Sequence, residues 1–208
     1  MSAPAISRYA VHLPAADDVA LWRERARQLV QCDVPPDRVS WIEPGATGDL
    51  FAPVGDKRLP LPGPDPRPVR ASRAFLALAE KALLHTDAER FALLYRLLWR
   101  LQRQPRLAED HTDPDMRRAE ALAREVRRDI HKMRAFVRFR AVEDESGAPH
   151  YVAWFEPQHH ILKANAGFFV RRFATMHWSI LTPAGTLHWD GETVREGPPA
   201  RAEDAPGG

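Results

Sequence analysis

The stretch around His131 carries the densest group of side chains able to do polar chemistry. In a helix, Arg128, His131 and Lys132 would fall within one turn and face away from Ile130 and Met133. A neutral His beside two cations holds its proton weakly, which suits a general base or a contact to phosphate. A His near a helix end more commonly interacts with the terminal carbonyl groups. Both interpretations therefore stay open.

A second polar group is Glu156-Pro-Gln-His-His160, which follows a predicted strand and opens a predicted helix. A Glu, two His and a helix N-terminus together could bind an anion or hold a metal. Two adjacent His cannot share one helical face, however, so we predict no metal site and no cofactor. If the fold brings them together, the candidates for a catalytic centre are His131, Glu156, His159, His160 and His177.

Basic residues are concentrated between positions 117 and 140. This stretch contains nine basic and three acidic residues, a net charge of +6 in a chain whose total net charge is only +2. Such groups displace the counterions of nucleic acid and bind its backbone without reading sequence. The expected DNA contacts are Arg124, Arg127, Arg128, Lys132, Arg134, Arg138, Arg171 and Arg172, and the preceding helix adds Arg90, Arg96, Arg100, Arg103 and Arg106 to the basic zone. The alternative is a solvated helix surface whose charges pair with Glu120 and Glu125.

Hydrophobic spacing predicts the elements that position these groups. Alternation predicts strands over 8–13, 39–42, 135–142, 150–155, 177–181 and 186–189. Helical spacing predicts helices from Asp17 or Asp18 to Pro35, over 72–85, from Thr86 to Pro105, from Asp113 to Met133 and over 157–176. This order predicts an α+β fold with central helices packed on a mainly antiparallel sheet.

Two His-Trp pairs lie on strands that should pair, His177-Trp178 and His188-Trp189. Successive residues of a strand face opposite sides, so one member of each pair must face the core. We expect that member to be the Trp. His177 and His188 would then be neighbours on the other face.

At 208 residues the chain can bury a core without disulfides, and we predict one α+β domain over 1–196. A Pro-rich surface excursion spans 44–68, and 197–208 reads as a linker-like tail. Cys32 alone allows neither an intramolecular disulfide nor a multi-Cys zinc finger. No apolar run reaches the ~20 residues of a membrane span, and the N-terminus lacks a signal peptide pattern, so we expect a cytoplasmic protein.

Four segments resemble a bacterial family of DNA-metabolism proteins that is formally a domain of unknown function: 129–140, 154–160, 168–173 and 178–183. The resemblance spans roughly Arg8 to Gly191. It implies a role in DNA repair or modification beside a radical-SAM protein, or fusion N-terminal to a type X uracil-DNA glycosylase. Family members continue past the last strand with a helical segment, which implies a shortened chain or one half of a fusion.

The leading hypothesis is a DNA-binding accessory domain for such a partner. One alternative is a nucleic-acid- or nucleotide-processing enzyme with a His/Glu centre, and another is an interaction module that docks the partner through exposed aromatics. No phosphate-binding Gly-rich loop, dinucleotide-binding motif or nucleophile elbow occurs, and one Cys cannot build a deaminase site. The Gly-Glu-x-Pro-Gly run of the glycosylase is also absent, so that activity is not assigned.

Overall fold

The computed structural model describes residues 8–44, 58–143 and 148–206. The chain divides into two compact units, Met1–Arg124 and Glu125–Gly208, and each is described here by itself. The prediction of one domain over 1–196 stays a prediction. Most of the predicted excursion over 44–68 lies outside the described residues. Within the described ranges, no helix combines the length and the apolar character needed to cross a membrane.

Unit 1 opens with two strands that pair in parallel, β1 (Tyr9–His12) and β2 (Val39–Ile42). Parallel strands need a long connection rather than a tight turn. Helix α1 (Val19–Gln31) and the 3₁₀ turn η1 (Pro36–Arg38) provide it. Asp18 caps α1 by accepting a hydrogen bond from the Leu21 amide at 2.9 Å, so the predicted cap is confirmed.

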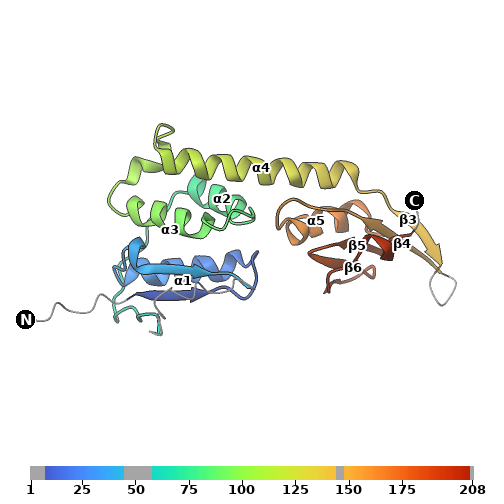
Figure 1. The fold of residues 1–208 in the computed structure, drawn as a ribbon, viewed down its shortest axis with the longest axis horizontal. Coiled ribbons are helices and arrows are strands. Elements are labelled where there is room, and N and C mark those ends of the chain that lie inside the picture. The colour runs from blue at the N-terminus through green and yellow to red at the C-terminus, as the bar shows by residue number, and fades with distance from the viewer. Residues whose placement is uncertain (1–7, 45–57, 144–147, 207–208) are drawn as a thin grey trace, which may run out of the picture. The chain divides into compact units, whose positions relative to one another are not determined.

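Three further helices complete unit 1: α2 (Arg73–Ala82), α3 (Arg90–Leu101) and the first part of α4 (Pro114–Phe136), with the 3₁₀ turn η2 (Pro105–Glu109) before α4. Figure 1 shows α2 and α3 beside this part of α4. Helix α3 is apolar on most sides, and the Tyr95 hydroxyl donates to the Val34 carbonyl at 2.6 Å. Unit 1 therefore has one continuous core, which includes Trp22, Phe75, Phe91, Leu94 and Leu97.

Unit 2 is built on a five-stranded sheet in the order β3-β4-β5-β6-β7. The strands are β3 (Arg140–Glu143), β4 (Pro149–Trp154), β5 (Trp178–Thr182), β6 (Gly185–Trp189) and β7 (Val194–Gly197). Every pairing is antiparallel except that of β4 with β5, which helix α5 (Leu162–Arg172) connects. The predicted α+β class with a mainly antiparallel sheet is confirmed.

The core of unit 2 gathers around Trp178, which is fully buried. Its indole contacts the rings of Phe139 and Phe169, at centroid distances of 5.9 and 6.2 Å. Trp189 is also buried, whereas His177 is exposed and His188 is half-buried. The prediction that the Trp of each pair faces the core is therefore confirmed.

The largest differences from the prediction concern the end of α4, the start of α5 and an additional strand. Helix α4 continues to Phe136, so the strand expected over 135–142 is reduced to Arg140–Glu143. Helix α5 begins at Leu162 instead of near Pro157. Strand β7 was not predicted, because Val194-Arg-Glu-Gly197 shows no apolar alternation.

The segment expected to form a linker-like tail makes contacts within unit 2. The Ala200 amide donates to the carbonyl of Thr182, at the end of β5, at 3.0 Å. A 3₁₀ turn, η3 (Ala202–Asp204), follows it. The backbone after β7 therefore returns to the sheet.

Candidate nucleic-acid interface

Helix α4 presents a cationic face to solvent. Arg124, Arg127, Arg128 and Lys132 are all exposed, as is His131 between them. The side of the helix that carries Val126, Ile130 and Met133 is buried, because these apolar residues recur at intervals of three or four. The expectation that Arg128, His131 and Lys132 face away from Ile130 and Met133 is confirmed.

Among the described residues, Arg127, Arg128 and Lys132 form no ion pair, although Glu125 is exposed on the same helix. Other arginines, such as Arg96, Arg100 and Arg118, do have acidic partners. Glu120, which could have neutralised the helix surface, lies 2.9 Å from His111 Nδ1. The observation weighs against a helix surface of paired charges and favours the phosphate interpretation.

The third acid of the basic stretch, Asp129, is 2% exposed and plays a different part. Its Oδ2 atom accepts hydrogen bonds from the backbone amides of Gln158 and His159, at 2.9 and 3.0 Å. Those amides belong to the loop between β4 and α5. Asp129 therefore holds this loop against α4. In the sequence, Asp129 is recognisable only as one of the three acidic charges of the basic stretch.

Two of the expected phosphate contacts have structural partners. The Arg134 Nε donates to Asn165 Oδ1 at 2.8 Å, and its guanidinium lies 4.8 Å from the ring centre of Phe168. Arg134 thus ties α4 to α5. One nitrogen of Arg138, Nη1, donates to the carbonyls of Ala135 and Val137 at 2.7 and 3.0 Å. This contact covers the last turn of α4 and leaves the other guanidinium nitrogens of Arg138 available.

The remaining two, Arg171 and Arg172, are exposed in the last turn of α5. The guanidinium of Arg172 lies 5.3 Å from the ring centre of Phe173. Cations at the C-terminal end of a helix interact favourably with the helix dipole. Arg171 and Arg172 therefore stabilise α5 independently of any contact with phosphate.

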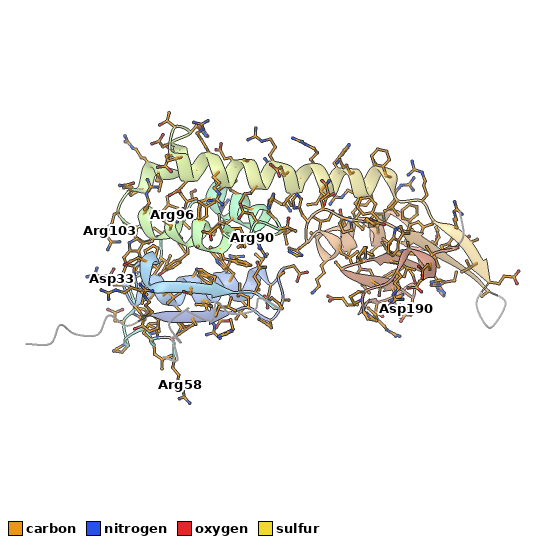
Figure 2. All side chains as sticks on the ribbon, viewed as in Figure 1. Asp33, Arg58, Arg90, Arg96, Arg103 and Asp190 are labelled. Atoms are coloured by element: carbon orange, nitrogen blue, oxygen red, sulfur yellow. The ribbon has the colours of Figure 1, made fainter. Side chains whose placement is uncertain are left out.

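Of the five arginines that the sequence added to the basic zone, four have acidic partners: Arg90, Arg96, Arg100 and Arg103. Arg90 is fully buried and pairs with Glu43. Arg96 pairs with Asp115, and Arg100 pairs with both Asp113 and Asp115. Arg103 pairs with Asp33 at 3.2 Å. Figure 2 labels Arg90, Arg96, Arg103 and Asp33 in unit 1. Their partners are distant in sequence, so composition alone could not reveal the pairing.

The candidates for a catalytic centre do not converge. His131 lies about 200° around α4 from Asp129, which faces the loop that carries Glu156, His159 and His160. His177 lies at the start of β5, where its carbonyl accepts from Tyr151. Glu156 lies beyond the far end of β4, about 16 Å along the strand at 3.3 Å per residue. Glu156 itself accepts a hydrogen bond from the Trp154 indole at 3.0 Å.

A different polar group, which sequence reasoning missed, crosses three strands of the sheet. Ser179 Oγ lies 2.7 Å from both His150 Nε2 and His188 Nδ1. The other ring nitrogen of His188 lies 2.9 Å from Thr186 Oγ1. His188 is thus opposite Ser179, its register partner, and His177 lies two residues before Ser179 along the chain. Burial lowers the pKa of His188, and the nearby charge of His150 lowers it further.

In addition to this chain of hydrogen bonds, unit 2 contains a pocket of about 330 Å³. It is bounded by the end of α4, by strands β3 and β4, and by the segment after β7. The residues that line it are Phe136, Arg138, Arg140, Val152, Trp154, Ala202, Ala205 and Pro206. Two arginines and two aromatic rings therefore share one cavity.

A family model described as a domain of unknown function, DUF4130, matches residues 88–201, more than half of the chain. The chain belongs to this family. The DUF4130 segment contains α3, the whole of α4 and the whole five-stranded sheet. The comparison with curated proteins found no match, and the comparison with solved structures found none either. The DUF4130 description assigns no function, so any function must be argued from the surface of α4 and from the sheet.

Proposed function

We propose that this DUF4130 protein is a DNA-binding accessory component of DNA repair or modification. The observation that carries the proposal is the exposed face of α4, on which Arg127, Arg128 and Lys132 have no acidic partner among the described residues. Three cations spaced along one helix suit the phosphates of a nucleic-acid backbone, which they bind without reading base sequence.

The proposal includes a partner enzyme. Its support is the resemblance of the segments 129–140, 154–160, 168–173 and 178–183 to DNA-metabolism proteins that accompany a radical-SAM protein or a type X uracil-DNA glycosylase. The dispersal of His131, Glu156 and His177 weakens the alternative of a single His/Glu catalytic centre. The chemistry would then belong to the partner, and this chain would hold the DNA.

The test is fluorescence anisotropy of a labelled 20-nucleotide DNA, single-stranded and duplex, at a series of salt concentrations. The full chain is compared with a double variant, Arg127→Ala with Arg128→Ala. We expect the double variant to bind both DNAs about tenfold more weakly. The slope of log K against log salt should also fall, by about 1 for each phosphate contact removed.

A matched control removes the same charge elsewhere. Arg67 and Arg73 are exposed in unit 1 and lie outside α4. The variant Arg67→Ala with Arg73→Ala should keep the affinity and the salt slope. Absence of DNA binding at low salt, or equal losses in the two double variants, would refute the proposal.

A further inference from the structure

The pocket at the end of α4 combines two kinds of recognition chemistry. Phe136 is 68% exposed, unusual for a large apolar side chain, and borders the pocket together with Trp154. The Trp154 indole is held in place by its hydrogen bond to Glu156. Aromatic rings held open to solvent are the surfaces on which unpaired bases stack.

The polar walls of the same pocket are guanidinium groups. Arg140 lies opposite Val152 in the register of β3 and β4, so it projects from the same face of the sheet. Arg138 uses only Nη1 for the carbonyls at the end of α4. Its Nε and Nη2 atoms make no hydrogen bond among the described residues, and a planar guanidinium matches the oxygens of a phosphate.

The pocket continues the cationic row on α4. Arg128, Lys132 and Phe136 follow one another at intervals of four residues. Residues four apart lie on the same side of a helix, about 6 Å apart along its axis. A strand whose phosphates lie on Arg128 and Lys132 would therefore reach Phe136 and the mouth of the pocket within one or two nucleotides.

The pocket volume suits one small ligand. Small-molecule sites range from about 300 to 1,000 Å³, and a cavity of about 330 Å³ lies at the lower end. A base pair within a duplex keeps its faces stacked on its neighbours, so it cannot offer them to Phe136 or Trp154. The ligand that fits both the aromatic rings and the arginines is a nucleotide that is not base-paired.

We infer that this pocket takes one unpaired nucleotide of a single strand, with its base on Phe136 and Trp154 and its phosphate on Arg138 and Arg140. The inference rests on the proposed function and adds to it a preference for single-stranded over duplex DNA. The cationic face of α4 supplies affinity for any DNA. The pocket supplies the discrimination between the two forms.

The experiment measures binding of the full chain to labelled dT12 and to a 12-base-pair duplex. Phe136→Ala alters an exposed side chain and should leave the fold intact. We expect this variant to bind dT12 about tenfold more weakly, as for the loss of a stacking aromatic, and to bind the duplex within twofold of the original chain. The variant Arg127→Ala with Arg128→Ala should weaken both equally.

Two further arms identify the ligand. Binding of dT12 should quench indole fluorescence in the original chain, and Trp154→Phe should lose that part of the quench while keeping most of the affinity. Thymidine 5′-monophosphate should compete far more weakly than dT12. Equal competition would mean that the pocket serves a free nucleotide and would overturn the inference of a strand.

The outcomes also separate this inference from the proposed function. If neither DNA binds, both fail. If both DNAs bind and Phe136→Ala changes neither affinity, or changes both by the same factor, the pocket inference fails while the proposed function stands. Unchanged fluorescence quenching in Trp154→Phe would likewise overturn the placement of the base.

Discussion

Arg90 is a cation inside an apolar core, and each of its three guanidinium nitrogens has a partner. Its guanidinium donates to the carbonyls of Leu83, Asp87 and Ala16 at 2.9–3.0 Å and pairs with Glu43. Removing such a group would leave the half-buried carboxylate of Glu43 and three carbonyls without their donor. At the scale of single residues, the contacts of an arginine in this chain therefore decide whether it stabilises the fold or is available to a ligand.

Two arginines of α4, Arg127 and Arg128, differ from those of α3 in that respect. Arg90, Arg96 and Arg100 have acidic partners, whereas Arg127 and Arg128 have none among the residues that the structure describes. An exposed guanidinium with no acid nearby keeps its full charge for a ligand. Much of the excess of Arg over Lys is thus structural, and a smaller part remains for binding.

His188 makes unit 2 sensitive to acid. Because burial and the charge of His150 lower its pKa, the unfolded chain takes up this proton at a higher pH than the folded chain does. The contribution of His188 to the free energy of unfolding is therefore fully present above the ordinary His pKa of about 6.5. It declines as the pH falls below that value. Arg195 lies opposite His188 on β7, where it pairs with Asp190.

We predict that His188→Asn flattens this dependence. The Asn side chain can still bond Ser179 but does not titrate. Urea unfolding between pH 5 and 7.5 should show a smaller slope in this variant, by up to about 1.4 kcal/mol per pH unit for one proton. His131→Asn, on the exposed face of α4, is the control and should leave the slope unchanged. An unchanged slope in His188→Asn would contradict the assignment.

At the scale of elements, α4 depends on how it begins. Asp113 Oδ1 accepts from the amides of Asp115 and Met116, at 3.0 and 3.1 Å, which is the arrangement of an N-cap. The same carboxylate accepts hydrogen bonds from the guanidinium of Arg100. The neighbouring Asp115 carboxylate accepts hydrogen bonds from Arg96 and Arg100. The hydrogen bond from Arg100 lowers the pKa of Asp113, and that from Arg96 lowers the pKa of Asp115.

We predict that Asp113→Ala lowers the free energy of unfolding by about 1–2 kcal/mol, the usual cost of losing a cap. Asp113→Asn keeps an accepting oxygen and should cost less. Because both carboxyl pKa values are depressed, the ion pairs stabilise the fold above about pH 3.9 and are lost as the pH falls through the folded values. Denaturant unfolding of both variants and of the original chain at pH 7 and at about pH 2.5, below the ordinary Asp pKa, tests this. Equal losses for Asn and Ala would contradict the cap.

Local signals predicted most elements. Asp18, Ser72 and Asp113 cap α1, α2 and α4 as their positions before apolar stretches indicate. The stretch 135–142 misled the prediction because Phe-Val-Arg-Phe alternates while Val137 also continues the helical spacing of Met133. The backbone follows the helical spacing as far as Phe136, where α4 ends. Strand β7 forms through backbone pairing with β6, which leaves no mark on side-chain pattern.

The candidate site was predictable only in part. The cationic face of α4 follows from residue spacing within one helix, so the sequence contains it. The chain from His150 through Ser179 to His188 depends on the register of three strands, which the sequence does not specify. The pocket likewise needs α4, β3, β4 and the segment after β7 to meet.

At the scale of the whole molecule, net charge hides the proposed interface. Unit 2 contains 11 Lys or Arg residues and 11 Asp or Glu residues, so its net charge is zero. Its acids lie mainly in 143–145 and 190–204, away in sequence from the basic stretch of α4. A neutral unit exerts little long-range attraction, and charges separated by more than about 8–10 Å are screened at physiological salt. DNA affinity should therefore depend on contacts made directly by the row on α4.

The extent of the DUF4130 match also leads to a prediction. The segment 88–201 contains α3 but omits β1, α1, β2 and α2, against which α3 packs. Phe91 and Tyr95, which contact Trp41 in the full chain, would be uncovered. We predict that the isolated segment aggregates or binds a hydrophobic dye strongly, because the exposed apolar patch has no cover.

A chain beginning at Arg8 provides the control for that prediction, since it retains β1 and every element after it. It should unfold cooperatively and stay monomeric in light scattering. A segment 88–201 that is equally monomeric and cooperative would show that α3 needs no cover from the first 87 residues.

The parallel pairing of β1 with β2 has a consequence for the order of events during synthesis. Tyr9 pairs with Val39, so β1 leaves the ribosome well before β2, its partner among the described strands, exists. Helix α1 must be made in between, and the ends of that connection must then meet at an entropic cost. Until Ile42 has emerged, the backbone groups of β1 are open to any other extended chain. Strand β1 is thus exposed while α1 and β2 are being made, and helper proteins that shield nascent chains would act on it during that interval.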